Sequence, residues 1–274
     1  MDNKAINVVI TGGSRGIGLG LAINFLKRNC NVTISGMNET RLKNTLSKLR
    51  KDFPNQNISG FISNITDRTE VEKLCERALE DNGSIDIWVN NAGKGQNMEY
   101  SWNLDIETYT NIISTNVTGL MHGSLAVMNK MIKQGSGKIF NMEGFGSNGM
   151  IRPKMAVYGT TKKAVRYFTR ALAKEAENTK ILIGTISPGM VITDLITEPL
   201  NQLSQEERKK TIKIFNILAD RVETVTPFLV DRILKTTKNG IRIEWLTKAK
   251  IFWRFLSAVI IKRNIISSNE TEND

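Results

Sequence analysis

The chain has 274 residues, of which 40% are hydrophobic and 24% are charged. These proportions are ordinary for a soluble globular protein and exclude collagen-like, coiled-coil and largely disordered chains. The formal net charge is +11, and residues 238–263 contribute +6 of it, because seven basic side chains there accompany one acid. A partner or surface that this charge recognises is therefore expected near the C-terminal end.

Cysteine usage and hydropathy indicate a cytoplasmic protein. Cys30 and Cys75 are too few for a disulfide framework and lack metal-ligand spacing, which is typical of a reducing compartment. The first residues lead directly into an apolar pattern, without a basic region or cleavage site. Nowhere do about 18 apolar residues follow one another, so no spanning helix is predicted.

Short β-branched runs alternate with longer helical patterns, which is typical of a parallel sheet wrapped by helices. The predicted strands cover residues 7–10, 32–35, 58–63, 85–89, 138–142, 181–186 and 240–246. The predicted helices cover residues 17–28, 39–51, 67–80, 105–133 (interrupted or started afresh near Asn116) and 154–177. The predicted fold class is α/β, a Rossmann-type doubly wound parallel sheet.

No internal repeat or low-complexity linker divides the sequence. We therefore expect one domain over residues 1–246, in which the segment 194–220 is helical and forms a lid over the substrate. A basic aromatic helix over 247–263 and a disordered tail over 264–274 are expected to follow it.

A glycine-rich loop lies between the first predicted strand and the first predicted helix. Gly12, Gly16 and Gly18 are spaced for a tight turn, a close backbone approach to a pyrophosphate and close helix packing. Strand, loop and helix occur in the order that a dinucleotide site requires, so we expect this loop to bind a nucleotide cofactor.

The charges near this loop favour NADP(H). A carboxylate at the end of the second strand would select NAD through the ribose 2′-OH, but no acid occurs there before Glu39. Arg15 and Arg41 are placed to pair with a 2′-phosphate, and no nearby acid is expected to repel it. The alternative is that Arg41 belongs to a solvated helix face.

Tyr158 and Lys162 are four residues apart at the start of a predicted helix, so the phenol and the ammonium share one helix face. A neighbouring ammonium, together with the charge of a nearby oxidised nicotinamide, is expected to lower the pKa of the phenol into the range in which it exchanges protons. This spacing alone is common, and its weight comes from the glycine loop, Asn90–Gly93 and Ser187–Gly189 in the same chain.

Together these motifs resemble the short-chain dehydrogenase/reductase family over residues 5–195. The resemblance implies that Tyr158 is the general acid/base, that Lys162 tunes its pKa and holds the nicotinamide ribose, and that Asn116 bends its helix and supports a proton-relay water. It implies a cofactor site made of Gly12, Ser14, Arg15, Gly16, Ile17, Gly18, Arg41, Asn64, Ile65, Asn91, Ala92, Gly93, Tyr158, Lys162, Pro188, Gly189, Ile192 and Thr193.

One position departs from the family pattern, which usually places a substrate-orienting serine about 13 residues before the tyrosine. Gly144 or Phe145 occupies that place, and Ser147 is the nearest hydroxyl, so Ser147 is the fourth candidate catalytic residue; a turn-capping role is the alternative. The stretches 140–147, 156–162, 187–195 and 241–247 look like the chlorophyll(ide) b reductase branch, which reduces a formyl group on a chlorin ring.

The segment 248–263 is aromatic, apolar and basic, as an interfacial helix on an anionic membrane would be. The alternative is a helix that packs on its own domain or on a second subunit. Nucleic acid is not expected, because the aromatic residues cluster with aliphatic ones and no nucleic-acid motif is present.

The predicted function is reduction of a carbonyl, an aldehyde or ketone of a bulky or lipophilic molecule, to an alcohol or the reverse, with NADP(H). The alternative is a non-catalytic NADP(H)-binding sensor or scaffold protein, suggested by the displaced serine. The family resemblance implies a homodimer or homotetramer formed through the two long helices, and no metal.

Overall fold

A computed structural model describes residues 5–200, 203–258 and 260–266. Seven parallel strands form one sheet in the order β3-β2-β1-β4-β5-β6-β7. In chain order they are β1 (Asn7–Thr11), β2 (Asn31–Gly36), β3 (Ile58–Ile62), β4 (Ile87–Asn90), β5 (Gly137–Met142), β6 (Ile181–Ser187) and β7 (Arg242–Glu244). The predicted doubly wound parallel sheet is confirmed.

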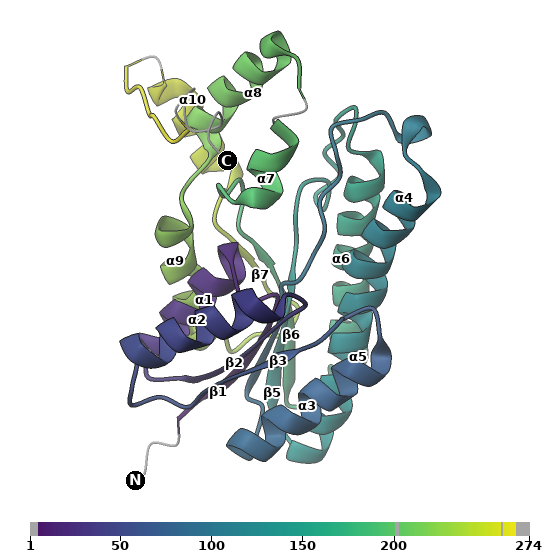
Figure 1. Ribbon diagram of the computed structural model, residues 1–274, viewed down its shortest axis with the longest axis vertical. Helices are drawn as coiled ribbons and strands as arrows, with labels where there is room; N and C mark the ends of the chain where they lie inside the picture. Colours follow the sequence, from purple (N-terminus) through teal and green to yellow (C-terminus); the bar gives the residue numbers. More distant parts are fainter. Residues whose placement is uncertain (1–4, 201–202, 259, 267–274) are drawn as a thin grey trace.

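Helices cover both faces of this sheet (Figure 1). One face carries α1 (Gly16–Leu26), α2 (Glu39–Asp52) and α9 (Val222–Lys235). The other carries α3 (Arg68–Asn82), α5 (Leu120–Gln134) and α6 (Ala156–Glu175), with α4 (Ile106–Ile113) packed beside α6. Two hydrophobic layers therefore enclose the sheet.

The strands alternate between these two layers. In β1, Val8 and Ile10 pack under α1, whereas Val9 packs on the opposite side. All three are at most 2% exposed, which is why the strand is a continuous apolar run rather than an alternation of apolar and polar residues. Cys30 and Cys75 are free and buried in the two layers.

Helix α9 is an element that the sequence analysis did not predict. Its buried residues Val225, Leu229 and Ile233 recur at helical spacing, but Pro227 stands among them. A proline inside a helix removes a backbone donor and usually argues against one. Packing on α1 outweighs this cost: Gly20 of α1 has no Cβ, and one there would overlap Val222.

The remaining helices gather at the carboxyl end of the sheet (Figure 1). They are α7 (Asp194–Leu200), α8 (Gln205–Leu218) and α10 (Lys248–Ser257). Helix α10 is shorter than the predicted helix over 247–263. The start of the predicted tail, residues 264–266, is held on α8, because the Asn216 side chain accepts hydrogen bonds from the backbone N–H groups of Ile265 and Ile266. Residues 267–274 lie outside the described residues.

Candidate functional site

The glycine loop lies where the strand order reverses. Strand β1 pairs with β2 on one side and with β4 on the other, so the loops after β1 and β4 leave in opposite directions at the same edge. The Asn91 side chain donates hydrogen bonds of 3.0 Å to the carbonyls of Thr11 and Gly12, which ties the two loops together. This is the place at which doubly wound sheets bind ligands.

Three contacts explain why this loop needs glycine. Gly12 has φ +66°, and a Cβ there would lie 2.9 Å from the Cα of Ala92. Gly16 has φ +55° and faces the Thr193 side chain from the loop after β6, while a Cβ at Gly18 would overlap the carbonyl of Gly12. The backbone is therefore bare where a dinucleotide needs close approach.

Helix α1 begins at Gly16 and presents its first N–H groups to this loop. Arg15 precedes it in extended conformation and supplies no side-chain cap, and the first turn contains no acid. Uncapped N–H groups at a helix start favour an anion such as a phosphate. The loop, the bare backbone and the helix start together fit a dinucleotide.

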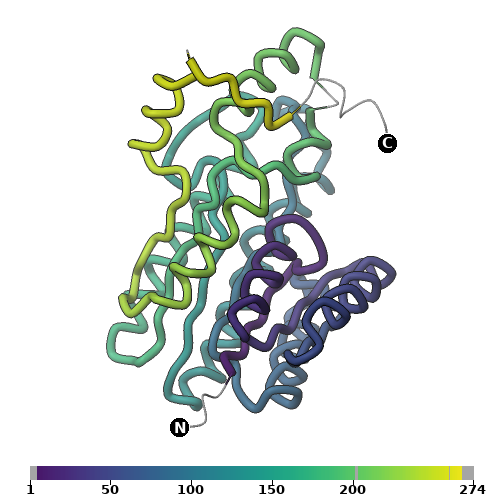
Figure 2. Tube along the Cα trace, turned by 90° about the vertical axis from the view of Figure 1, so that its left-hand side faces the viewer, coloured from purple at the N-terminus to yellow at the C-terminus, as the bar shows by residue number. Residues whose placement is uncertain are grey.

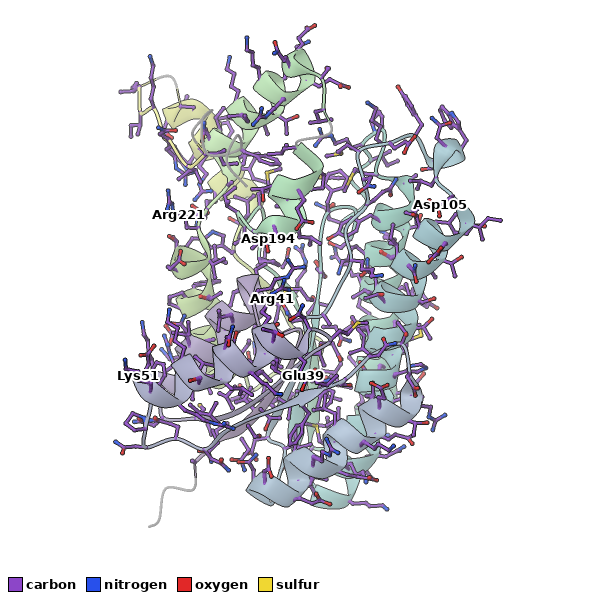
Figure 3. All side chains as sticks on the ribbon, in the orientation of Figure 1. Glu39, Arg41, Lys51, Asp105, Asp194 and Arg221 are labelled. Atoms are coloured by element: carbon purple, nitrogen blue, oxygen red, sulfur yellow. The ribbon has the colours of Figure 1, made fainter. Side chains whose placement is uncertain are left out.

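An acidic side chain lies closer to the predicted 2′-phosphate position than the sequence suggested. Arg15 Nη1 is 2.7 Å from the Asp194 carboxylate and 3.9 Å from Glu198, both on α7. The expectation that no acid lies nearby was wrong, because α7 folds back over the glycine loop. Figure 3 shows Arg41 at the start of α2, below Asp194 in that view; Arg41 is exposed.

Tyr158 and Lys162 lie on one face of α6, as predicted. Tyr158 is 8% exposed and Lys162 is 5% exposed. The Lys162 ammonium lies 5.6 Å from the centre of the Tyr158 ring and donates to the carbonyl of Met142, at the end of β5, at 3.3 Å. Two buried, protonatable groups are thus held at the edge that carries the glycine loop.

Burial disfavours the charged form of both groups, so their pKa values shift in opposite directions. It raises the pKa of Tyr158 to about 12 and lowers that of Lys162 to about 8, while the Glu143 carboxylate acts in the opposite direction on Lys162. The expected lowering of the phenol pKa is therefore not produced by the protein's own groups, because desolvation dominates at Tyr158.

Asn116 lies in a π-helical turn, Ser114–Gly119, between α4 and α5. Its side-chain amide donates to the carbonyl of Lys94 at 2.9 Å and to the Thr161 hydroxyl at 3.2 Å, and its oxygen accepts from the N–H of Lys94 at 2.8 Å. Asn116 therefore links the loop after β4 to the residue before Lys162. The interruption expected near this residue in the long helix is confirmed.

Glu143 and Ser147 form a buried polar cluster beside the tyrosine. The Ser147 hydroxyl donates to Glu143 Oε2 at 2.9 Å, and the same oxygen accepts from Arg242 Nε at 2.9 Å. A Cβ at Gly144 would overlap the Tyr158 hydroxyl, so the backbone of Gly144 lies directly against the tyrosine. Ser147 gives its one proton to Glu143, and its catalytic role stays a prediction.

The loop after β6 closes the predicted cofactor site. It holds Pro188, Gly189 (φ +76°), Ile192 and Thr193, and the N–H of Ile192 donates to the carbonyl of Asp220 at 3.0 Å. Asn64 and Ile65 follow β3 and lie at the same edge; Ile65 is buried against Gly119. The predicted nucleotide residues therefore come from the ends of several neighbouring strands.

Two buried residues at this site were not predicted. Gln96 accepts a hydrogen bond from the backbone N–H of Tyr158 at 2.9 Å, and its Nε2 has no partner among the described residues. Asp220 fixes the loop after β6 and also binds Arg254 and Arg263. Neither residue belongs to a sequence motif. Their partners are distant in sequence and come close only in the folded chain.

Comparison with known proteins places these features in a family. The family model described as short chain dehydrogenase matches residues 6–214. The chain is 34% identical to the chloroplastic chlorophyll(ide) b reductase NOL of Oryza sativa subsp. japonica, over 92% of this chain and 75% of that protein. It is also 34% identical to the chloroplastic, probable chlorophyll(ide) b reductase NYC1 of Arabidopsis thaliana, over 89% of this chain but only 51% of that protein.

Solved structures agree on the fold. Levodione reductase superimposes with a TM-score of 0.81 at 21% identity, covering 91% of this chain and 98% of that chain. An actinorhodin polyketide ketoreductase with NADPH gives a TM-score of 0.77 at 23% identity, covering 88% of this chain and 96% of that one.

Proposed function

The chain belongs to the short-chain dehydrogenase family, and on that premise we propose that it is an NADP(H)-dependent oxidoreductase that interconverts a carbonyl and an alcohol. One observation carries the proposal: buried Tyr158 and Lys162 stand side by side at the sheet edge that also carries the glycine loop. The predicted roles of Tyr158, Lys162, Asn116 and the cofactor residues form part of it.

The nicotinamide cofactor would supply the hydride to the substrate carbon, or accept it in the reverse direction. The bare backbone of Gly12 and Gly16 and the uncapped start of α1 would hold its pyrophosphate. Arg15 and Arg41 would pair with the 2′-phosphate. Thr193 and Ile192 would contact the nicotinamide side from the loop after β6.

Tyr158 would give its proton to the substrate oxygen during reduction and take it back during oxidation. At a pKa of about 12 the phenol remains protonated at neutral pH, which suits the acid of the reduction direction. The oxidation direction needs the phenolate, which the Lys162 ammonium would stabilise. Asn116 would keep the loop after β4 fixed against α6 while this happens.

The substrate we propose is bulky and lipophilic. Lys154, in the loop before α6, lies 5.4 Å from the Tyr100 ring centre and 3.0 Å from the Glu207 carboxylate of α8, so three segments converge above the site. These segments and α7 expose large apolar side chains: Tyr100, Trp102, Met150, Ile151, Leu195 and Ile214. The relatives named chlorophyll(ide) b reductase are consistent with a large ring system.

The proposal is tested by incubating the protein and NADPH with a panel of aromatic and aliphatic aldehydes and ketones. The measurement is the decrease in NADPH absorbance with each compound. Tyr158→Phe should lower kcat by about 100-fold or more on any substrate found, because it removes the general acid. Unchanged turnover of that variant would overturn the assignment. Tight NADPH binding with no turnover of any carbonyl would instead identify a sensor or scaffold protein.

We propose assembly as a homodimer or homotetramer through the face of α4, α5 and α6. This face exposes Ile113, Leu125, Ile132 and Tyr167, which a second copy would cover. Sedimentation velocity of the full chain tests it, and a monomer at micromolar concentration would contradict it.

A further inference from the structure

Helix α10 turns its polar side toward the protein. Arg254 donates to the carbonyl of Leu218 at 2.7 Å and to the carboxylate of Asp220 at 2.8 Å. Arg263, beyond the helix, binds the same carboxylate at 2.7 Å, and Asp220 is only 4% exposed. The Lys250 ammonium lies 3.0 Å from the centre of the Trp245 ring. The inward side of α10 is therefore held by cations.

The outward side of this segment is apolar. No residue of α10 is buried, and Trp253 is 63% exposed. A surface helix in a globular protein normally turns its apolar side to the core and its charges to water. Here the order is reversed, and the described structure leaves six large apolar side chains uncovered: Phe252, Trp253, Phe255, Leu256, Ile260 and Ile261.

We infer that this face, formed by α10 and residues 260–262, docks on an anionic lipid surface. The stretch 248–263 contains five basic residues and no acid, and Lys248 and Lys262 are exposed at its two ends. Aromatic and aliphatic side chains between exposed lysines match the headgroup region of an anionic bilayer, where apolar side chains insert and cations meet lipid phosphates.

A second copy of the chain fits this face less well. A symmetric dimer brings the same patch of both subunits together, so the basic residues of 248–263 would face one another without an acid in that stretch to pair with. Lysine is also depleted at protein interfaces. None of the described helices has the length and hydropathy to cross a bilayer.

The docking face lies at the same end of the molecule as α7 and α8 (Figure 1). Figures 1 and 2 both place α10 beside α8, and the two helices are in contact. Asp220, which anchors Arg254, also accepts from the N–H of Ile192 and donates its own N–H to the carbonyl of Met190. A lipid surface on α10 would thus lie next to the loop after β6.

Co-sedimentation with vesicles tests the inference on the full chain. The protein should pellet with vesicles of phosphatidylcholine and phosphatidylglycerol, bind phosphatidylcholine vesicles at least about tenfold more weakly, and be released by high salt. Trp253→Ser should weaken binding by about tenfold or more, because it removes an exposed aromatic ring that would insert among the lipid headgroups. The ring is 63% exposed, so its loss should leave the fold intact. The double variant Lys248→Ala/Lys262→Ala should weaken vesicle binding by about 25-fold, because each lysine near an anionic surface contributes about fivefold.

Trp102→Ser is the matched control, since Trp102 is 79% exposed but lies in the turn Ser101–Asn103 before α4. Figure 1 shows α4 and α10 on opposite sides of the view. Trp102→Ser should bind vesicles as the parent does, and so should Tyr158→Phe, which separates docking from catalysis. Thermal unfolding followed by circular dichroism shows that each variant is folded. The inference is overturned if the parent does not pellet with vesicles, or if Trp253→Ser pellets as well as the parent. It is also overturned if the parent binds no lipid and Trp253→Ser alone changes from dimer to monomer.

Discussion

The carboxylate of Glu143 accepts a hydrogen bond of 2.9 Å from Arg242 Nε, and the Glu143 side chain has no exposed surface. The pair joins the end of β5 to β7 across the intervening strand β6. Glu143 also acts on Lys162, because its negative charge favours the ammonium form that burial disfavours. We therefore expect Glu143 to act on Tyr158 through Lys162, as a positioning residue.

Glu143→Gln should move the alkaline limb of the pH–rate profile for carbonyl reduction to lower pH. A negative neighbour raises the pKa of a lysine, so its removal lets the pKa of Lys162 fall further below about 8. The fraction of protein with charged Lys162 then declines at a lower pH, and kcat declines with it. The measurement is kcat against pH from about 6 to 10 with saturating NADPH.

Glu244→Gln is the matched control for this prediction. Glu244 also pairs with Arg242, but it is not among the charges that shift Lys162. Its alkaline limb should coincide with that of the parent. Equal profiles for all three proteins would show that Glu143 is a structural residue only.

Ser147→Ala should affect stability as well as activity. Ser147 is 2% exposed, and its hydroxyl donates to a carboxylate, a kind of bond that contributes about 1.5–3 kcal/mol. Urea unfolding should show a loss of this size. If Ser147 also orients the substrate, kcat should fall as steeply as in Tyr158→Phe; a loss of stability with kcat within about threefold of the parent would assign Ser147 to the Glu143 cluster alone.

Asp220→Asn should destabilise the protein by about 3–5 kcal/mol, because it leaves two largely buried guanidinium groups without their counter-charge. Trypsin should then cut faster after Arg254 and Arg263. Asp231→Asn is the control: Asp231 pairs with Arg28 at 2.6 Å but is half exposed, so its loss should cost at most about 1 kcal/mol. Equal unfolding midpoints for the two variants would contradict the anchoring role of Asp220.

The elements that local sequence patterns determine were predicted well. Apolar runs such as Val8–Ile10 and the glycine spacing at 12, 16 and 18 act over a few residues. The strands, the glycine-rich turn between β1 and α1, and the shared helix face of Tyr158 and Lys162 could therefore be predicted from the sequence. The structure adds what depends on long-range packing. Helix α9 forms despite the proline at position 227 because it packs on α1. The contact between Val222 and Gly20 joins residues more than 200 positions apart in the sequence.

Charge partners could not be predicted for the same reason. Glu143 and Arg242 are 99 residues apart, and Arg15 and Asp194 are 179 apart. No local pattern indicates which oppositely charged side chain a fold will bring into contact. The same limit applies to Gln96. Its hydrogen bond with the backbone of Tyr158 joins residues 62 apart in the chain, and no sequence pattern indicates it.

The pairing of Arg15 with Asp194 sharpens the prediction about the cofactor. If Arg15 binds the 2′-phosphate, its guanidinium must be shared between that phosphate and the Asp194 carboxylate 2.7 Å away. Arg15→Ala should therefore weaken NADPH binding by about 10- to 100-fold, at about 1.5–3 kcal/mol for one charge-assisted contact, and leave NADH nearly unchanged.

Asp194→Asn should act in the opposite direction and strengthen NADPH binding by at most about fivefold. Both side chains of this pair are about half exposed, 52% and 57%, so the competing ion pair is worth no more than about 1 kcal/mol. Lys51→Ala is the control, because Figure 3 shows Lys51 at the end of α2 far from Arg41. Titration calorimetry with both nucleotides measures the effects. Equal affinity of the parent for NADPH and NADH would refute the NADP(H) assignment, whereas weaker NADPH binding by Asp194→Asn would show that Asp194 orients Arg15 rather than competing for it.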